Sequence, residues 1–365
     1  MTPLLILGGG PAGASAAIAL GRAGTSALLM ERTRETGDAL CGGFLSWRTL
    51  SALDALGIAA DELNTAPLTR VRLFAGDRRR EAQLPAPARA VSRRRLDTLL
   101  LDRAARAGAR IERGMTAREV DARADGWAVR FADGGTIATE ALFLASGKHD
   151  VRGRARPAAA RGRDPTIGIR LRLAPSPTLS RLVGDAIELH LVDRGYAGLV
   201  LQEDGSANLC CAVHRSRLTE AGGVEALLAA MAHEVPALAE RLAQADGPID
   251  TVANVPYGWR ERSGEAGLFR LGDQAAVIPS LAGEGMGIAV ASGTRAAAAY
   301  LHGGPAAAAT YQRGLAAAAA RPLAVAGAAW RIAERPMLAS MAVAALPMGL
   351  IQVIARATRI DHSTR

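Results

Sequence analysis

Short apolar runs and longer alanine-rich stretches alternate along the first part of the chain. Residues 3–7 and 26–31 have the continuous apolar character of buried parallel strands, and residues 14–23 between them predict a helix. Further along, apolar positions at helical spacing mark residues 93–107, and strands are predicted at 127–131 and 141–145. This order of elements is typical of a Rossmann-like α/β unit.

The pattern changes near residue 165. Alternating or β-rich segments separated by turn residues predict an antiparallel sheet, with strands at 166–174, 185–192, 197–203 and 207–213. A buried strand is predicted within 268–276, and the chain from residue 285 onward has a helical pattern. The predicted fold is therefore α/β, with a Rossmann-like nucleotide-binding domain, an antiparallel β-sheet substrate domain and a helical C-terminus. The predicted boundaries are 1–65, 90–164 and 262–305 for the first domain, 66–89 and 165–261 for the second, and 306–365 for the helical region.

Composition and charge exclude some classes of function. Apolar residues make up 49% of the 365 residues and charged residues 22%, an ordinary globular balance. The net charge is +9, but the arginines are scattered and no aromatic residues interleave with them, so no nucleic acid partner is expected. Three cysteines, Cys41, Cys210 and Cys211, give no disulfide framework, and a reducing cytoplasm fits them best. No metal site is predicted.

A glycine-rich turn follows the first predicted strand. Gly8, Gly10 and Gly13 occupy the positions of a G-x-G-x-x-G motif, which allows a tight turn and lets the backbone approach a pyrophosphate at the helix start. Glu31 closes the next strand, where its carboxylate can accept hydrogen bonds from ribose hydroxyls and disfavours a 2′-phosphate. FAD or NAD is therefore expected here. The predicted contact residues are Gly8, Gly10, Pro11, Ala12, Gly13, Glu31 and Arg32.

A second motif lies at 268–293. Its strand delivers Gly272 and Asp273 to a turn, and the Asp273 carboxylate can accept hydrogen bonds from a polyol such as a ribityl chain. The sequence GEGMG then opens a long helix, whose first amides suit the electron-rich edge of a flavin. The residues assigned to this second contact are Gly272, Asp273, Gly285, Met286 and Gly287, and the family resemblance of these motifs adds Pro279.

These two motifs, with SRRRLDTLLLDRAARAGA and ALCGGFLS, resemble the geranylgeranyl reductase and aromatic hydroxylase superfamily, whose members are class A flavoprotein monooxygenase-like FAD proteins. The resemblance covers nearly the whole chain. It implies FAD as cofactor, with NAD(P)H or a separate reductase as the electron donor. It also implies a flavin-nucleotide contact from Arg93, an isoalloxazine-side loop at Cys41, Gly42 and Gly43, and an adenosine-side segment containing Ala145 and Gly147.

The chain departs from the hydroxylase pattern in two places. Lys148, His149 and Asp150 follow the ASG segment where many hydroxylases carry Asp-Gly, and no histidine follows Asp273. The W-x-W-x-I-P signature of flavin halogenases is also absent, which argues against halogenation. The leading interpretation is hydride transfer from reduced FAD to a double bond of a bulky, largely apolar isoprenoid or polyketide-like molecule. The alternatives are a monooxygenase acting through a C4a-hydroperoxide and, in another class, a membrane-associated electron-transfer flavoprotein.

No catalytic acid or base follows from the sequence, and the candidates are Cys41, His190 and His214. Each has a structural alternative, as a small buried hydrophobe or as a histidine satisfied within the sheet. Lys148 and His149 can bind a pyrophosphate or the reductant, although a solvated loop is the simpler interpretation.

The segment 337–355 is uncharged and is bounded by Arg335 and Arg356. Its length approaches that of a membrane span, but Pro347 and Gly349 interrupt it. Three hypotheses follow: helices that roof a pocket, a helix pair that contacts a membrane surface, or a span. The expected location is the cytoplasm, with the membrane surface as the alternative.

Overall fold

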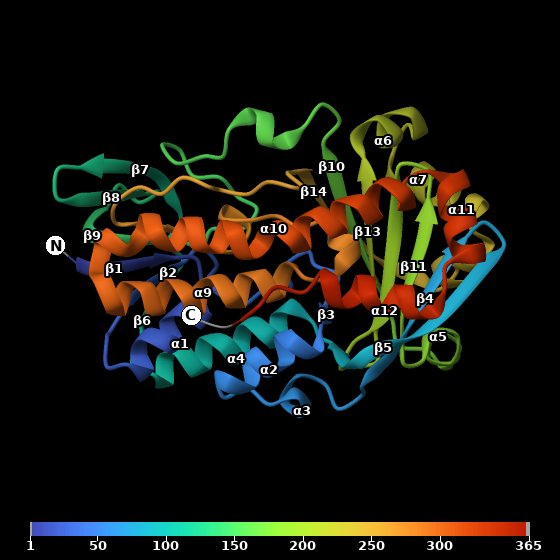
Figure 1. The fold of residues 1–365 in the computed structure, drawn as a ribbon, viewed down its shortest axis with the longest axis horizontal. Coiled ribbons are helices and arrows are strands. Elements are labelled where there is room, and N and C mark those ends of the chain that lie inside the picture. The colour runs from blue at the N-terminus through green and yellow to red at the C-terminus, as the bar shows by residue number, and fades with distance from the viewer. Residues whose placement is uncertain (1, 363–365) are drawn as a thin grey trace.

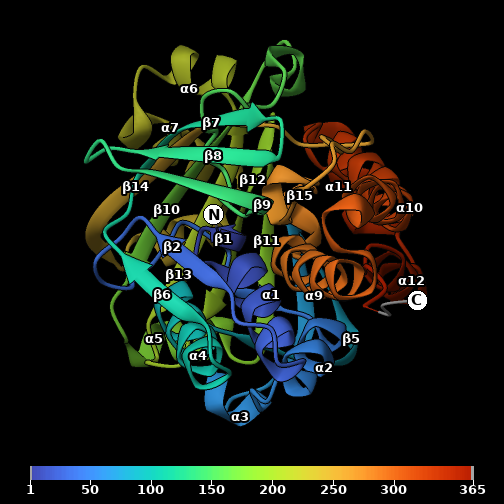
Figure 2. The same cartoon turned by 90° about the vertical axis from the view of Figure 1, so that its left-hand side faces the viewer.

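The computed structural model describes residues 2–362, apart from the side chain of Asp246. Two β-sheets lie next to each other along the long axis, and the helix α10 (Ala308–Ala333) runs past both of them (Figure 1). The helices of the C-terminal region gather on one side of the molecule (Figure 2).

The first sheet has seven strands in the order β6-β2-β1-β9-β8-β7, with β15 also paired to β9. Strands β6, β2, β1, β9 and β15 are parallel, as the continuous apolar runs predicted, and β7 and β8 form an antiparallel extension. The bounds are β1 Thr2–Leu7, β2 Leu28–Glu31, β6 Arg110–Arg113, β7 Ala117–Arg123, β8 Gly126–Phe131, β9 Thr136–Leu144 and β15 Leu268–Arg270.

Three helices cover the first sheet. Alanine and glycine dominate the contact faces of two of them, α1 and α9, which pack closely, and Gly293 of α9 leaves no room for a side chain against Ala12. Their bounds are α1 Pro11–Arg22, α4 Arg93–Arg106 and α9 Gly285–Gly303. The connection after β3 contains two further helices, α2 Trp47–Ala55 and α3 Ala60–Leu63.

The second sheet has eight strands in the order β14-β10-β13-β12-β11-β4-β5-β3. The prediction of an antiparallel sheet is wrong for one pair, because β4 and β11 run parallel. These two strands lie more than a hundred residues apart in sequence, and a connection of that length removes the constraint that a hairpin imposes. The bounds are β3 Phe44–Leu45, β4 Leu68–Ala75, β5 Arg78–Ala90, β10 Thr166–Leu173, β11 Ala186–Val192, β12 Gly195–Leu201, β13 Ala207–His214 and β14 Ala245–Val255.

Helices cover both faces of the second sheet. Four that the sequence analysis did not predict lie within 177–242, and three of them pack leucine, valine and methionine side chains against one face. They are α5 Pro177–Val183, α6 Arg215–Ala221, α7 Val224–Glu234 and α8 Pro236–Leu242. The other face meets the C-terminal helices α10, α11 (Pro336–Ala345) and α12 (Met348–Ala357).

Within residues 2–362, no single helix is long and apolar enough to cross a membrane. The pair α11 and α12 reaches the required length and composition together, but the two helices are bent by 117° where they meet.

Candidate functional site

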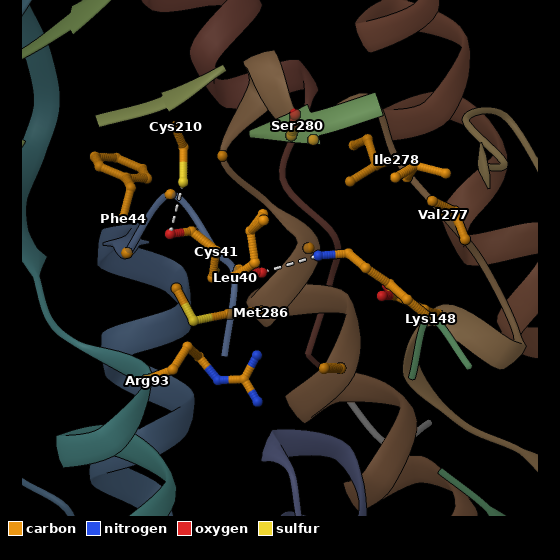
Figure 3. A pocket seen from close by; sticks show the side chains of 18 of the residues that line it. Leu40, Cys41, Phe44, Arg93, Lys148, Cys210, Val277, Ile278, Ser280 and Met286 are labelled. Carbon is orange, nitrogen blue, oxygen red and sulfur yellow. Dashed lines mark hydrogen bonds between the residues drawn. The ribbon is translucent and has the colours of Figure 1, made fainter. Parts of the chain in front are cut away.

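A cavity of about 210 Å³ lies where the two sheets meet. One part of its wall comes from loops at the carboxyl ends of the parallel strands, which is where α/β folds place their ligands. The other part comes from strands β11 to β14 of the second sheet. Figure 3 shows side chains from both parts converging on the same space.

The glycine-rich turn after β1 is held by backbone contacts. Gly8 donates its N–H to the carbonyl of Met30 at 2.8 Å, and its φ of +113° is one that residues with a side chain rarely adopt. A Cβ on Gly8 would lie 2.4 Å from the carbonyl oxygen of Ala145, and one on Gly13 would lie 2.0 Å from that of Gly8. The turn therefore has to be glycine at both positions.

Glu31 is fixed beside this turn. Its carboxylate accepts a hydrogen bond from the N–H of Gly9 at 2.7 Å, and from the N–H and hydroxyl of Thr33 at 2.9 Å each. The acid that closes β2 thus sits against the turn, in the position from which the sequence analysis expected it to bind a ribose. Arg32 is exposed next to it.

The wall on this side fits a cofactor that approaches the backbone closely. Gly10, Gly42, Gly147 and Gly285 all line the cavity, and a Cβ at Gly42, Gly147 or Gly285 would meet no atom within 4 Å. The missing side chains thus leave open space along the path that an extended dinucleotide would follow. Backbone amides at the start of α9 add a partial positive charge at one end of this path.

Two charged side chains face the glycine-lined part of the cavity, which we call the cradle. Arg93, at the first turn of α4, donates from Nε and Nη2 to the two oxygens of Asp97, at 2.8 and 2.6 Å. Burial works against the charge of Arg93, but its pairing with Asp97 prevails and raises the pKa of the guanidinium. Its Nη1 has no hydrogen-bond partner among residues 2–362, so one donor group remains for a ligand. Asp273 lines the same space, and its carboxylate likewise accepts no hydrogen bond from the described chain.

The start of α9 is clamped by the C-terminal segment, which the sequence analysis missed. Glu284 is fully buried at the helix start, where it accepts hydrogen bonds from Arg359 at 2.5 Å and from the N–H of Ile360 at 3.1 Å. Arg359 also donates to the carbonyls of Gly283 and Ala282. Burial raises the pKa of Glu284 despite the nearby arginine. The residues of this clamp are 75 positions apart in sequence, so no local pattern marks them.

The loop of Cys41 reaches the second sheet through backbone oxygens. The Cys41 carbonyl accepts hydrogen bonds from Asn208 Nδ2 at 2.9 Å and from Cys210 Sγ at 3.1 Å. Lys148 Nζ donates to the carbonyl of Leu40 at 3.0 Å and lines the cavity, as Figure 3 shows. The interpretation of Lys148 as part of a solvated loop is therefore wrong, because its long side chain spans the gap to the Cys41 loop.

The second sheet presents an apolar wall with one polar cluster. Ile187, Leu189 and Tyr196 line the cavity from β11 and β12. The Tyr196 hydroxyl donates to Ser280 Oγ at 2.7 Å, and the Tyr257 hydroxyl hydrogen-bonds the same oxygen. Burial raises the pKa of Tyr196 and that of Tyr257, the latter to about 12, so both phenols stay protonated at neutral pH.

The two candidate histidines lie outside the cavity lining in the described part of the chain. His190 alternates with Leu189 along β11 and therefore points to the opposite face of the sheet. There it contacts Glu188 at 3.2 Å and stacks on Phe74. His214 ends β13 and bonds Glu334 at 2.9 Å. Neither histidine is therefore placed to contact a ligand held in this cavity.

Most of the predicted cofactor residues come together in this one cavity. Those that line it are Gly10, Pro11, Ala12, Cys41, Gly42, Gly43, Arg93, Ala145, Gly147, Gly272, Asp273, Gly285 and Met286. Others support it from behind. Gly287 packs against Glu284 and Thr49, and Pro279 precedes Ser280 in the chain.

A second, smaller hollow of about 180 Å³ adjoins the first, and Lys148 lines both. Its wall carries His149, Arg156 and Arg161, with Asp150 as the acid paired to Arg156 at 2.8 Å. Burial lowers the pKa of His149, and the positive charges of Arg32, Lys148 and Arg156 lower it further. The hollow is therefore a region of positive potential beside the cradle.

Comparison with known families gives an independent identification of the N-terminal part. Residues 1–149 match the family described as FAD binding domain. No curated protein sequence matches the chain.

Solved structures match almost the whole chain at low identity. PqsL of Pseudomonas aeruginosa in complex with 2-aminobenzoylacetate is 18% identical, covering 94% of this chain and all of that chain, with a TM-score of 0.74. The flavin-dependent brominase Bmp2 is 16% identical over 99% of this chain and 94% of that chain, with a TM-score of 0.76. The halogenase PltM, solved with phloroglucinol and FAD, is 12% identical over 92% and 78%, with a TM-score of 0.75.

One PqsL structure is described as a probable FAD-dependent monooxygenase. Residues 1–149 thus match an FAD binding domain, and the chain shares its fold with PqsL, Bmp2 and PltM.

Proposed function

We propose that the chain is an FAD-dependent monooxygenase that hydroxylates a largely apolar, polyketide-like aromatic molecule. The observation that carries this proposal is the continuity of the cavity. Glycine backbone, Arg93 and Asp273 line it on one side, and apolar side chains such as Leu189 line it on the other. A cofactor held on the first side would face a substrate held on the second without a wall between them.

The small molecules bound in two of the matched structures support an aromatic substrate over an isoprenoid. PqsL is described with 2-aminobenzoylacetate and PltM with phloroglucinol, which are both small aromatic molecules. Halogenation is not proposed, because the W-x-W-x-I-P signature is missing from this sequence.

When bound, FAD would accept two electrons from a donor and would activate dioxygen. The chain's own residues would then orient the substrate and exclude water. Ser280 Oγ accepts a hydrogen bond from the Tyr196 hydroxyl and also bonds the Tyr257 hydroxyl. Only one proton is needed between Ser280 and Tyr257, so the other of these two hydroxyl protons is left for an oxygen atom of the substrate. Because both phenols are protonated at neutral pH, this cluster binds a substrate hydroxyl or carbonyl as a donor and does not act as a base.

The basic hollow beside Lys148 suggests how the protein is reduced. Its positive side chains suit the phosphates of NAD(P)H, or of a reduced flavin delivered by a separate reductase. We therefore propose an anionic electron donor that approaches the cofactor from this side.

The test is turnover of the FAD-loaded protein under ¹⁸O₂ with a panel of alkylated phenols, supplied with NADH, NADPH or a free-flavin reductase. The expected product carries a single ¹⁸O atom, oxygen consumption matches product, and no product forms without oxygen. Replacing Ser280 with alanine should raise KM for hydroxylated substrates, while FAD absorbance stays unchanged.

The same experiment separates this proposal from the reductase interpretation. A product that forms anaerobically, contains two added hydrogens and carries no ¹⁸O would overturn the monooxygenase assignment.

A further inference from the structure

The two last helices form an apolar surface that no part of the described chain covers. We call residues 336–357, which are α11, α12 and the bend between them, the C-terminal elbow. Its outward side chains are large and apolar, and the exposed fractions are Met337 77%, Met341 59%, Met348 59%, Val353 54% and Leu350 43%. Most soluble surfaces scatter such residues singly, so five of them within residues 337–353 indicate an interaction site.

The elbow does not need these residues for its own packing. Ala339 and Val343 of α11 and Ile351 of α12 are buried against the second sheet. Exposed Met337, Met341 and Val353 each stand two positions from one of them, so these three side chains point away from the sheet. Arg80 of β5 donates to the carbonyls of Val343 and Ala344 and so satisfies the end of α11. The inner sides of the helices hold the elbow to the protein, and the outer sides are left for a partner.

The exposed charges at the two ends of the elbow are positive. Residues 336–355 contain no Asp, Glu, Lys or Arg, whereas Arg331, Arg335 and Arg356 lie exposed at its two ends. Within residues 2–362, none of these three guanidinium groups has an ion-pair partner. Glu334, the nearest acid in sequence, is turned inward to His214.

We infer that the C-terminal elbow docks on an anionic lipid bilayer surface. Apolar side chains that enter the boundary between headgroups and acyl chains, with arginines at the headgroup level, are the pattern of helices that lie in a membrane interface. The proposal places the elbow in the interface because α11 and α12 have 10 residues each and a bend of 117° separates them. About 20 residues in one helix are needed for a span.

A second copy of the chain fits this surface less well. In a two-fold symmetric contact the same surface meets itself, so that Arg331, Arg335 and Arg356 would face the same arginines of the partner. Like charges brought together in this way oppose association, whereas the phosphates of anionic lipids neutralise them.

The position of the elbow connects the bilayer with the cavity. Leu189 and Ile187 line the cavity and belong to the same apolar cluster as Ile351 and Leu346 of the elbow. A single layer of side chains therefore separates the docking surface from the apolar wall. This inference goes beyond the proposed hydroxylation, and docking would bring the cavity close to a reservoir of apolar substrate.

The test is flotation of the full-length, FAD-loaded protein with vesicles of phosphatidylcholine alone or mixed with phosphatidylglycerol. Wild-type protein should float with the mixed vesicles and should stay mostly in the bottom fraction with vesicles of phosphatidylcholine alone. The double variant Met341→Glu with Val353→Glu should lose flotation. The matched control is Leu301→Glu, because Leu301 is also a large apolar residue and is 43% exposed on α9. This variant should float like wild type.

The arginines are tested separately. Replacing Arg335 and Arg356 with glutamine should weaken binding to mixed vesicles about 25-fold, at about fivefold for each arginine near an anionic surface. The control is Arg321→Gln, which removes an exposed charge from the middle of α10 and should change little. FAD absorbance and the melting temperature show whether each variant is folded.

Wild-type protein that stays behind with mixed vesicles would overturn the inference, as would glutamate variants that float normally. A wild-type dimer that the glutamate variants dissociate, with no flotation, would assign the surface to a second copy instead. Flotation needs neither substrate nor turnover, so its result is independent of whether hydroxylation is found.

Discussion

The two sheets contribute to one cavity by different means. The first sheet contributes backbone: Gly8 and Gly13 let segments approach to distances that exclude any side chain, and Gly147, after β9, borders open space. The second sheet contributes side chains, with alternate residues of β11 divided between two environments. Leu189 faces the cavity, whereas Glu188 faces a buried ionic cluster under α8. Changes in the first sheet should therefore affect FAD binding. In the second sheet, changes on the face of Glu188 should lower stability, and changes on the face of Leu189 should alter substrate specificity.

The largest effect is expected from Glu188→Ala. Glu188 is fully buried and accepts hydrogen bonds from Arg241 at 2.9 Å and from Arg72, so its removal leaves two arginines without their shared partner. Breaking a buried pair in this way costs about 3–5 kcal/mol of unfolding free energy. The neighbouring change Leu189→Ala should cost less and should alter substrate KM. Urea unfolding measures the first effect, and equal losses from both variants would refute the division between the two faces.

The same carboxylate predicts how stability depends on pH. Burial alone would raise the pKa of Glu188, but hydrogen bonds from His190 and Arg241 outweigh it and lower this pKa from 4.5 to about 2. A folded-state pKa below the unfolded value means that the stabilisation is complete above about pH 4.5 and is lost as pH falls toward 2. In Glu188→Ala this part of the acid-unfolding curve should become flatter, as thermal melts over that range would show.

The next largest effect is expected on the cofactor side, from Gly8→Ala. A methyl group there meets the Ala145 carbonyl at 2.4 Å in a backbone conformation that disfavours any side chain. Strain and overpacking together cost roughly 2–4 kcal/mol, and the turn should shift away from β9. Fluorescence titration should show weak or no binding of FAD.

The control for Gly8→Ala is Gly314→Ala, in the exposed middle of α10, where a Cβ meets nothing within 4 Å. That change should stabilise the helix by roughly 0.5–1 kcal/mol and leave FAD binding intact. Normal FAD binding by Gly8→Ala would show that the turn does not hold the pyrophosphate.

The cofactor side was also the part that the sequence could predict. The glycine turn, Glu31 and the segment from Gly272 to Gly287 are local signals, because a tight turn, a strand end and a helix start each need particular residues within a short stretch. The family match over residues 1–149 agrees with that prediction of an FAD binding domain.

The second sheet was less predictable for a physical reason. Alternation shows that Glu188 and His190 share one face of β11, but it does not show which face meets the cavity. Two polar residues at this spacing would ordinarily indicate a solvated face. Here α8 covers them and supplies Arg241, which lies 53 residues away in sequence. The contact between Arg359 and Glu284 was unpredictable for the same reason. The two residues are far apart in sequence, and only the folded chain brings them together.

That clamp gives a prediction of intermediate size. Arg359→Met removes the cation beside Glu284 and frees the carbonyls of Ala282 and Gly283, next to the start of α9. Glu284 keeps its hydrogen bonds from Ser46 and Ile360 and can take up a proton, so the expected loss is about 1–3 kcal/mol. FAD affinity should fall with it, because α9 begins at the cradle. Glu284→Gln combined with Arg359→Met should recover part of the loss, and no recovery would argue against a direct coupling.

The smallest effect is expected from Tyr196→Phe, which tests the cavity face of the second sheet alone. The substitution keeps the ring packed against Trp330 and removes only the hydroxyl that donates to Ser280. Ser280 retains its hydrogen bond to Tyr257, so the net cost of the lost hydrogen bond is about 1 kcal/mol. If the cluster orients a substrate oxygen, KM should rise severalfold while FAD affinity stays within error of wild type, and urea unfolding should show a loss of no more than about 1 kcal/mol. The comparison variant is Phe74→Leu, on the opposite face of the same sheet beside His190, which should lower stability and leave KM alone. A rise in KM for Phe74→Leu, or a loss of FAD in Tyr196→Phe, would show that the two faces of the sheet are not independent, and the separation of specificity from stability would fail.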